Sequence, residues 1–136
     1  MAAPEGLGAC PSGRVPDCVS TADASGDPRR RLTPLGVAAP IADVSAAALR
    51  VLGRLPRGRV LERGVGRIRA RAVSRVLRLR TEVVVVVLPG AVHVRLAGPR
   101  GLLDPRTLRE RARDLLAAID AEIRGWDPPD GGWLRR

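Results

Sequence analysis

The residues with the clearest chemical potential form a cluster of arginines in the middle of the chain. Nine arginines and one acidic residue, Glu62, lie between residues 57 and 80. A guanidinium binds phosphate or carboxylate oxygens through two parallel hydrogen bonds, so a group of guanidiniums on one surface forms an anion-binding site. Alternation along strands would place many of these arginines on one face of a sheet. Our candidate phosphate contacts are Arg67, Arg69, Arg71, Arg75, Arg78 and Arg80.

The composition offers a second explanation for these arginines. All 24 basic residues are arginine, and the chain has no lysine, asparagine, glutamine, phenylalanine or tyrosine. The codons of those five missing types are poor in G and C, whereas those of alanine, glycine, proline and arginine are rich in them. A GC-rich bacterial coding sequence would add arginines at exposed positions. The net charge of +10 is typical of nucleic-acid binding, but this codon usage favours a solvated arginine face over a selected nucleic-acid site.

Few residues are candidates for catalysis. His93 is the only histidine, and in the stretch AVHVRL it alternates with valines, as an exposed strand residue does. The nucleophile motif GxSxG, the zinc motif HExxH and the phosphate-loop patterns GxxxxGK[ST] and GxGxxG do not occur. The acidic residues fall at a helix start or among arginines, where surface ion pairs account for them. We therefore expect no enzyme, no metal site and no cofactor.

The cysteines and the apolar runs bear on location. Cys10 and Cys18 lie in a segment without a core-forming pattern, which predicts ordinary cytosolic thiols rather than a disulfide or a zinc site. The N-terminus shows no secretory signal pattern. The longest apolar run, residues 83–88, is far shorter than the roughly 20 residues of a membrane-spanning helix. We expect a cytoplasmic protein that reaches a membrane only peripherally, through a partner.

Two helices are predicted by apolar residues at spacings of three and four. The first begins at about residue 41, after Pro40, and ends at Gly53. The second has Asp104 as its N-cap and Pro105 in its first turn, and it ends before Gly125. Its apolar stripe consists of Leu108, Ala112, Leu115, Leu116, Ile119 and Ile123.

The segment between the helices predicts strands. Residues 83–88 and 91–96 form the clearest hairpin, with Pro89 and Gly90 as its turn. The stretch RIRARAVSRVLRLR has two interpretations. As strand, its two alternating runs are out of phase and require a bend or bulge near residues 73–75. As helix, one face would carry Val65, Ile68, Ala72, Val76 and Leu79 without a break. We favour strands, because the later alternation continues into five valines.

These elements predict an α+β fold of two layers. Residues 33–124 would form the domain, with a small antiparallel sheet of two or three strands, one helix before it and one after it. Residues 1–32, rich in Gly, Pro, Ser and Ala, would be a disordered tail. Residues 125–136 would be a C-terminal tail. Its tryptophans, Trp126 and Trp133, either fold back over a gap in the core or anchor a partner.

The segment 36–123 resembles the alkaline shock protein family. The resemblance lies in the helix and turn IADVSAAALRVLGRLPRG, the strands after it, and AVHVRLAGPRGLLDPRTLRERARDLLAAI. Members of that family are small, non-enzymatic α+β domains of the bacterial envelope-stress response that assemble at the membrane through a partner. The resemblance implies the same kind of fold and role here, and it assigns no functional residue.

Two binding functions follow from the sequence. We favour a non-enzymatic interaction protein or envelope-stress-associated scaffold that binds a protein partner and can form a homo-oligomer. The alternative is a basic nucleic-acid-binding protein that contacts phosphates through an arginine-rich sheet face. No aromatic residue lies on the predicted sheet to stack on bases, so such binding would be weak and without sequence preference.

Overall fold

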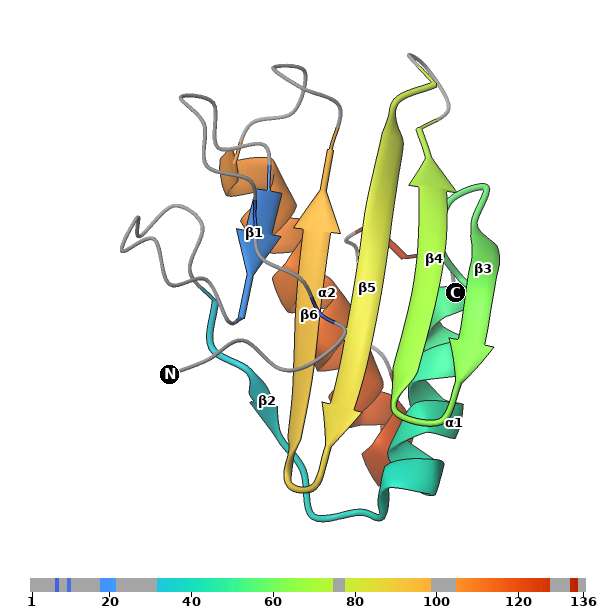
Figure 1. Ribbon diagram of the computed structural model, residues 1–136, viewed down its shortest axis with the longest axis vertical. Coiled ribbons are helices and arrows are strands. Elements are labelled where there is room, and N and C mark those ends of the chain that lie inside the picture. Colours follow the sequence, from blue (N-terminus) through green and yellow to red (C-terminus); the bar gives the residue numbers. More distant parts are fainter. Residues whose placement is uncertain are drawn as a thin grey trace.

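A computed structural model of the chain describes residues 7, 10, 18–21, 32–74, 78–98, 105–127 and 133–134. Within these residues the chain forms six strands and two helices, arranged as Figure 1 shows. The strands are β1 (Cys18–Ser20), β2 (Leu35–Gly36), β3 (Arg59–Gly64), β4 (Arg67–Val73), β5 (Arg80–Leu88) and β6 (Ala91–Ala97). The helices are α1 (Ile41–Leu52) and α2 (Pro105–Arg124).

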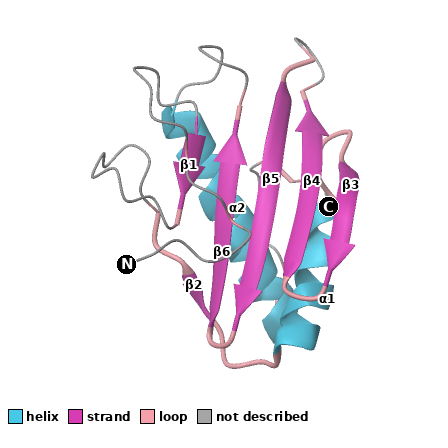
Figure 2. Cartoon of the chain, in the orientation of Figure 1, coloured by secondary structure: helices cyan, strands magenta, loops and turns pink. Residues whose placement is uncertain are grey.

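The six strands form one antiparallel sheet. Its order is β1-β6-β5-β4-β3, and β2 pairs with the beginning of β6 while β1 pairs with its end. Strands β3 to β6 are consecutive neighbours, so the central sheet is a meander. Both helices lie behind the sheet in Figures 1 and 2, so they cover the same face. The fold therefore has two layers, sheet and helices.

Alternation along the strands explains why one face of the sheet is buried. On β4 the buried residues are Ile68, Ala70 and Ala72, with arginines between them. The corresponding residues of β5 and β6 are Val83, Val85, Val87, Val92, Val94 and Leu96. The predicted stripe of α2 packs against this face, and Leu108, Ala112, Leu115 and Ile119 are fully buried. Neither described helix is long and apolar enough to cross a membrane.

The predicted hairpin of β5 and β6 is confirmed, with Pro89 and Gly90 between the strands. Gly90 has a φ of 82°, a left-handed conformation that a residue with a Cβ adopts only at a cost. Proline followed by such a glycine suits the two central positions of a type II turn. The local sequence therefore fixes both the position and the register of this hairpin.

The expectation of two or three strands is wrong, because the described chain contains six. The α+β content agrees with the expectation, but three strands were missed. Strands β1 and β2 have only 3 and 2 residues, too few to show a period. Strand β3 is an edge strand whose residues are almost all exposed, so no alternation of apolar and polar residues marks it. Its pairing with β4 also shifts register between Val60 and Glu62.

The strand interpretation of the arginine-rich stretch is confirmed for its first half, which is β4. The last residue of the stretch, Arg80, begins β5, and residues 75–77 lie outside the described part of the chain. The two runs are out of phase because they belong to two neighbouring strands joined by a connection, and not to one bulged strand. That connection starts at Ser74, whose N–H donates to the carbonyl of Leu79 at 2.9 Å.

Part of the segment that was expected to be a disordered tail packs on the sheet. Strand β1 pairs with β6, and Leu7 is completely buried. Cys10 and Cys18 are joined by a disulfide, with their Cα atoms 5.6 Å apart, so the expectation of free thiols is wrong. Sequence spacing gave no sign of this pairing because the sheet, and not the segment itself, provides the core against which these residues pack. The other residues before Leu32 lie outside the described residues, apart from Thr21.

Candidate functional site: the open face of the sheet

We call the side of the sheet without helices the open face. It carries the residues that alternate with the core, namely Arg67, Arg69 and Arg71 of β4, Arg80, Glu82, Val84, Val86 and Leu88 of β5, and His93, Arg95 and Ala97 of β6. The register puts Arg71 beside Glu82, and Arg69 and Arg95 on either side of Val84. The face therefore combines charged residues with an apolar patch, which we define as Val84, Val86 and Leu88.

Two of the arginines on β4 are held by one carboxylate from β3. Arg67 forms an ion pair with Glu62, with 2.6 Å between Nη1 and Oε2, and Arg69 Nε lies 3.9 Å from the same oxygen. The register shift next to Glu62 brings its side chain onto this face. All three side chains are substantially exposed, so the pairs contribute little stability, but they reduce the positive charge at this end of β4.

Three other arginines of the cluster, Arg71, Arg78 and Arg80, line a groove at the end of the open face where β5 begins and β6 ends. Its volume is about 610 Å³, and it is lined by Leu61, Arg71, Arg78, Leu79, Arg80, Glu82, Ala97 and Gly98. Within the described residues, no carboxylate forms an ion pair with Arg71, Arg78 or Arg80. Glu82 instead pairs with Arg95, at 3.5 Å. The groove thus presents three available guanidiniums beside the apolar side chains of Leu61, Leu79 and Ala97.

The connection between β4 and β5 forms one edge of the groove, and two hydrogen bonds hold it in place. The hydroxyl of Ser74 accepts a hydrogen bond from the Leu79 N–H at 2.9 Å, and the Ser74 N–H donates back to the Leu79 carbonyl. Between them Arg78 has a φ of 51°, which is uncommon for a residue with a Cβ and concentrates at functional sites. The two bonds hold Arg78 in this conformation at the groove.

The structure therefore divides the six predicted phosphate contacts. Arg71, Arg78 and Arg80 come together in the groove, whereas Arg67 and Arg69 lie at Glu62. Arg75 lies outside the described residues. Sequence reasoning missed Leu61, because β3 was not predicted, and a simple run of arginines does not show which ones have carboxylate neighbours.

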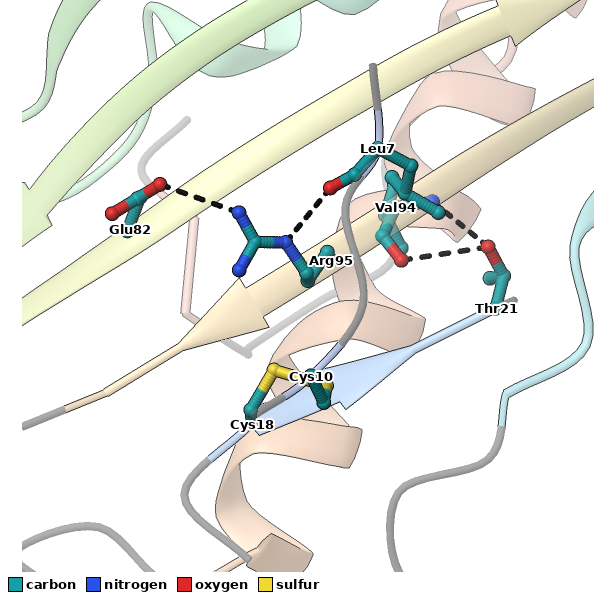
Figure 3. Close-up of a disulfide and its surroundings, with 7 residues drawn as sticks. All are labelled: Leu7, Cys10, Cys18, Thr21, Glu82, Val94 and Arg95. Atoms are coloured by element: carbon teal, nitrogen blue, oxygen red, sulfur yellow. Dashed lines mark hydrogen bonds and ion pairs between the residues drawn. A yellow bond between two sulfur atoms is a disulfide. The ribbon is translucent and has the colours of Figure 1, made fainter. Parts of the chain in front are cut away.

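The apolar patch is covered by Leu7. Leu7 is fully buried against Val84 and Val86, which are 1% and 2% exposed. The carbonyl of Leu7 accepts a hydrogen bond from Arg95 Nε at 2.9 Å, and the same guanidinium reaches Glu82 (Figure 3). Arg95 thus connects Leu7 to Glu82, which lines the groove. Its place on the open face follows from alternation with Val94, but its role depends on a residue far away in the sequence.

His93 lies on the open face beside strand β1. Its Nδ1 is 2.9 Å from the Thr21 hydroxyl, which also accepts a hydrogen bond from the Val94 N–H at 3.1 Å. Partial burial lowers the pKa of His93 by desolvation, which favours the neutral ring. The Thr21 hydroxyl also lies 3.4 Å from the Val94 carbonyl, so the tautomer of the ring decides whether Nδ1 donates to the hydroxyl or accepts from it. A hydroxyl beside an imidazole resembles a nucleophile and its base. Among the described residues, however, no third group orients the ring.

The described residues contain no cluster of three or more His, Cys, Asp or Glu side chains that could hold a metal ion.

The two tryptophans differ in their surroundings. Trp133 packs against the core, with the Arg111 guanidinium 5.2 Å from its ring centre. Trp126 is 62% exposed and has Arg124 over its ring at 4.9 Å. Trp133 therefore folds back over the core, which leaves Trp126 as the tryptophan available to a partner.

The match to a known family decides where this chain belongs. A model of the family described as "Protein of unknown function (DUF1499)" matches residues 7–119. The chain belongs to the DUF1499 family. No curated protein and no solved structure matches it.

The resemblance to the alkaline shock protein family is therefore wrong. It rested on the order of helix, strands and helix, which many two-layer folds share, and that order did not include β1, β2 or β3. The DUF1499 match begins at Leu7, the residue that covers the open face. The family therefore includes the N-terminal segment that the composition had led us to treat as a tail.

Proposed function

We propose that this DUF1499 protein is a non-enzymatic binding domain that holds an acidic segment of a partner protein in the groove of Arg71, Arg78 and Arg80. The observation that supports it is the grouping of three guanidiniums, unpaired among the described residues, beside apolar side chains. A guanidinium fork matches a carboxylate with two hydrogen bonds, and aliphatic neighbours accommodate the stems of glutamates and adjacent apolar residues. An acidic peptide supplies both kinds of contact.

Nucleic acid is the second candidate, favoured by the number of arginines on the open face. Two observations make it the weaker one. Glu62 lies outside the groove beside Arg67 and Arg69, where it would repel a phosphate backbone laid across the sheet but not a peptide confined to the groove. The described part of the open face also offers no tryptophan, tyrosine or phenylalanine side chain on which a base could stack. The apolar walls of the groove add nothing to phosphate binding.

The non-enzymatic part of the proposal rests on the one histidine. General base catalysis requires a group whose pKa lies near neutrality and which is free to reach a substrate. His93 is the only histidine of the chain, and its Nδ1 is occupied by the hydroxyl of Thr21. Its burial lowers its pKa, which makes it a weaker base. These features fit a structural histidine on a binding domain.

The disulfide bears on where the protein works. A cytoplasmic location, which the sequence favoured, would expose Cys10 and Cys18 to reducing thiols, whereas disulfides persist in oxidising compartments. The bond between them therefore supports a working location that is more oxidising than the cytoplasm. Trapping the cysteines with an alkylating reagent during lysis of the native host tests this. Free thiols in the trapped protein would favour the cytoplasm instead.

The binding proposal is tested by fluorescence anisotropy with two labelled probes at a physiological salt concentration of about 0.15 M. One probe is a peptide of glutamate, leucine and alanine, and the other is duplex DNA. We expect micromolar binding of the peptide and weaker binding of the DNA. Replacing every glutamate of the peptide by glutamine should abolish its binding, because the contacts are charged hydrogen bonds.

Matched variants of the chain locate the site. Arg71→Ser should weaken peptide binding by about tenfold, since a charged hydrogen bond contributes roughly 1.5 kcal/mol, and combining it with Arg78→Ser and Arg80→Ser should abolish binding. The control replaces three arginines of α2 that lie behind the sheet, namely Arg106, Arg113 and Arg124, and removes the same charge. Equal losses in both triple variants would show that only net charge matters. Submicromolar DNA binding at this salt concentration would favour the second candidate.

A further inference from the structure

Burial of the apolar patch is unusual for its position in the sheet. Strand β5 is exposed at Arg80 and Glu82 on the open face, as expected where no helix covers it, yet Val84 and Val86 on the same face are buried. Among the described residues, the side chain that packs on both valines on this face is Leu7, and Leu88 packs against the same cluster. Without Leu7, these three residues would form an apolar surface beside the arginines.

Leu7 is attached to the sheet by a short covalent route. The disulfide links Cys10 to Cys18, and Cys18 is the first residue of β1, which pairs with β6. Leu7 is therefore about three residues from an anchored point when the disulfide is closed, and about eleven when it is open. The effective concentration of a tethered group falls roughly as the −3/2 power of tether length, so opening the disulfide weakens the docking of Leu7 by about sevenfold.

Among the described residues, one hydrogen bond holds Leu7 in addition to its apolar packing. Its carbonyl accepts one hydrogen bond from Arg95, and the Arg95 guanidinium has a second partner in Glu82 that it keeps when Leu7 leaves. Strand β1 has its own bonds to β6, and Thr21 continues them through Val94. Loss of the disulfide would therefore release Leu7 and Cys10 without detaching β1 from the sheet.

We propose that the Cys10–Cys18 disulfide is a redox-controlled latch that keeps Leu7 over Val84 and Val86, and that its reduction exposes this apolar surface next to the arginine groove. The reductant is a dithiol. The S–S bond accepts two electrons and two protons and becomes two thiols, while the dithiol becomes a disulfide. This inference stands on the packing of Leu7 and does not depend on the binding function proposed above.

The test follows exposure of the patch with Nile red, a neutral dye that fluoresces on apolar surfaces and has no charge to bind arginine. Adding dithiothreitol to the wild-type protein should raise the fluorescence several-fold, and the Cys10→Ser, Cys18→Ser double variant should show the high signal without reductant. Nuclear Overhauser contacts between the methyl groups of Leu7 and those of Val84 and Val86 should be present in the oxidised protein and weaker on reduction.

Two single variants make the test specific to Leu7. Leu7→Ser keeps the disulfide but removes the cover, so its fluorescence should be high in the oxidised form and rise little on reduction. Leu61→Ser changes an exposed leucine of the same face, outside the patch, and should respond to reduction as the wild type does. The same rise on reduction in Leu7→Ser as in the wild type would overturn the proposal, as would no rise in the wild type. Loss of the helical circular dichroism signal on reduction would also overturn it, because the latch opens locally.

Discussion

The two faces of the sheet come from the same strands but are built in different ways. The face under α1 and α2 contains only apolar side chains along β4, β5 and β6, apart from Thr81, and their cover comes from two regular helices. The open face mixes arginines, two glutamates, a histidine and an apolar patch, and the described cover is a single leucine. The comparison indicates that the helix-covered face contributes most of the free energy of unfolding. The open face carries the charged side chains available for binding, and we expect it to tolerate substitution better.

The largest effect is expected on the helix-covered face, at Leu115 of α2. This side chain is fully buried in the core, and Leu115→Ala should lower the free energy of unfolding by about 2–5 kcal/mol because it removes contacts and leaves a cavity. Arg113→Ala, two residues away on the exposed side of the helix, should change it by no more than about 0.5 kcal/mol. Urea unfolding measures both. Similar values would contradict the assignment of α2 to the core.

The same contrast explains how much could be predicted from the sequence. The two helices, the hairpin of β5 and β6 and the core residues of α2 follow from local periodicity and turn chemistry, and the structure confirms them. Strand β3 could not be found this way, because an edge strand with exposed residues has no apolar period. The site depends on pairing between distant residues, such as Leu7 with Arg95, 88 residues apart. Nothing local in the sequence encodes such a contact.

The next largest effect on stability is expected at the N-terminal cover of the open face. Replacing Cys10 and Cys18 by serine opens a short loop and should lower the free energy of unfolding by about 2–3 kcal/mol in the chain-entropy view. Thermal unfolding of the oxidised protein and of the double variant checks this. The variant should still fold, because the helix-covered core does not include the disulfide. A variant that does not fold would show that the two faces are not independent in the way proposed.

A smaller effect is expected from His93, through pH. Desolvation lowers its pKa in the folded state, so the unfolded state binds the proton more readily. Its contribution to stability is therefore present above the unfolded pKa of about 6.5 and is lost as pH falls through the lower, folded value. Urea unfolding between pH 7 and pH 5 should show this decline, and His93→Gln should reduce it. An unchanged decline in the variant would mean that carboxylates, and not His93, cause the pH dependence.

The smallest effect on stability is expected at Glu62, where the charge balance of the open face can be changed with little change to the fold. Its ion pairs with Arg67 and Arg69 are exposed, so Glu62→Gln should change the free energy of unfolding by less than about 1 kcal/mol. Binding should respond more than stability, because the substitution removes a negative charge from the open face that carries the groove. We expect tighter binding of the acidic peptide, measured by anisotropy.

The control is Glu110→Gln, which removes the same charge from α2, where Glu110 pairs with Arg106. If both variants tighten binding equally, the gain comes from net charge alone; a gain confined to Glu62→Gln shows that Glu62 limits anion binding on the open face.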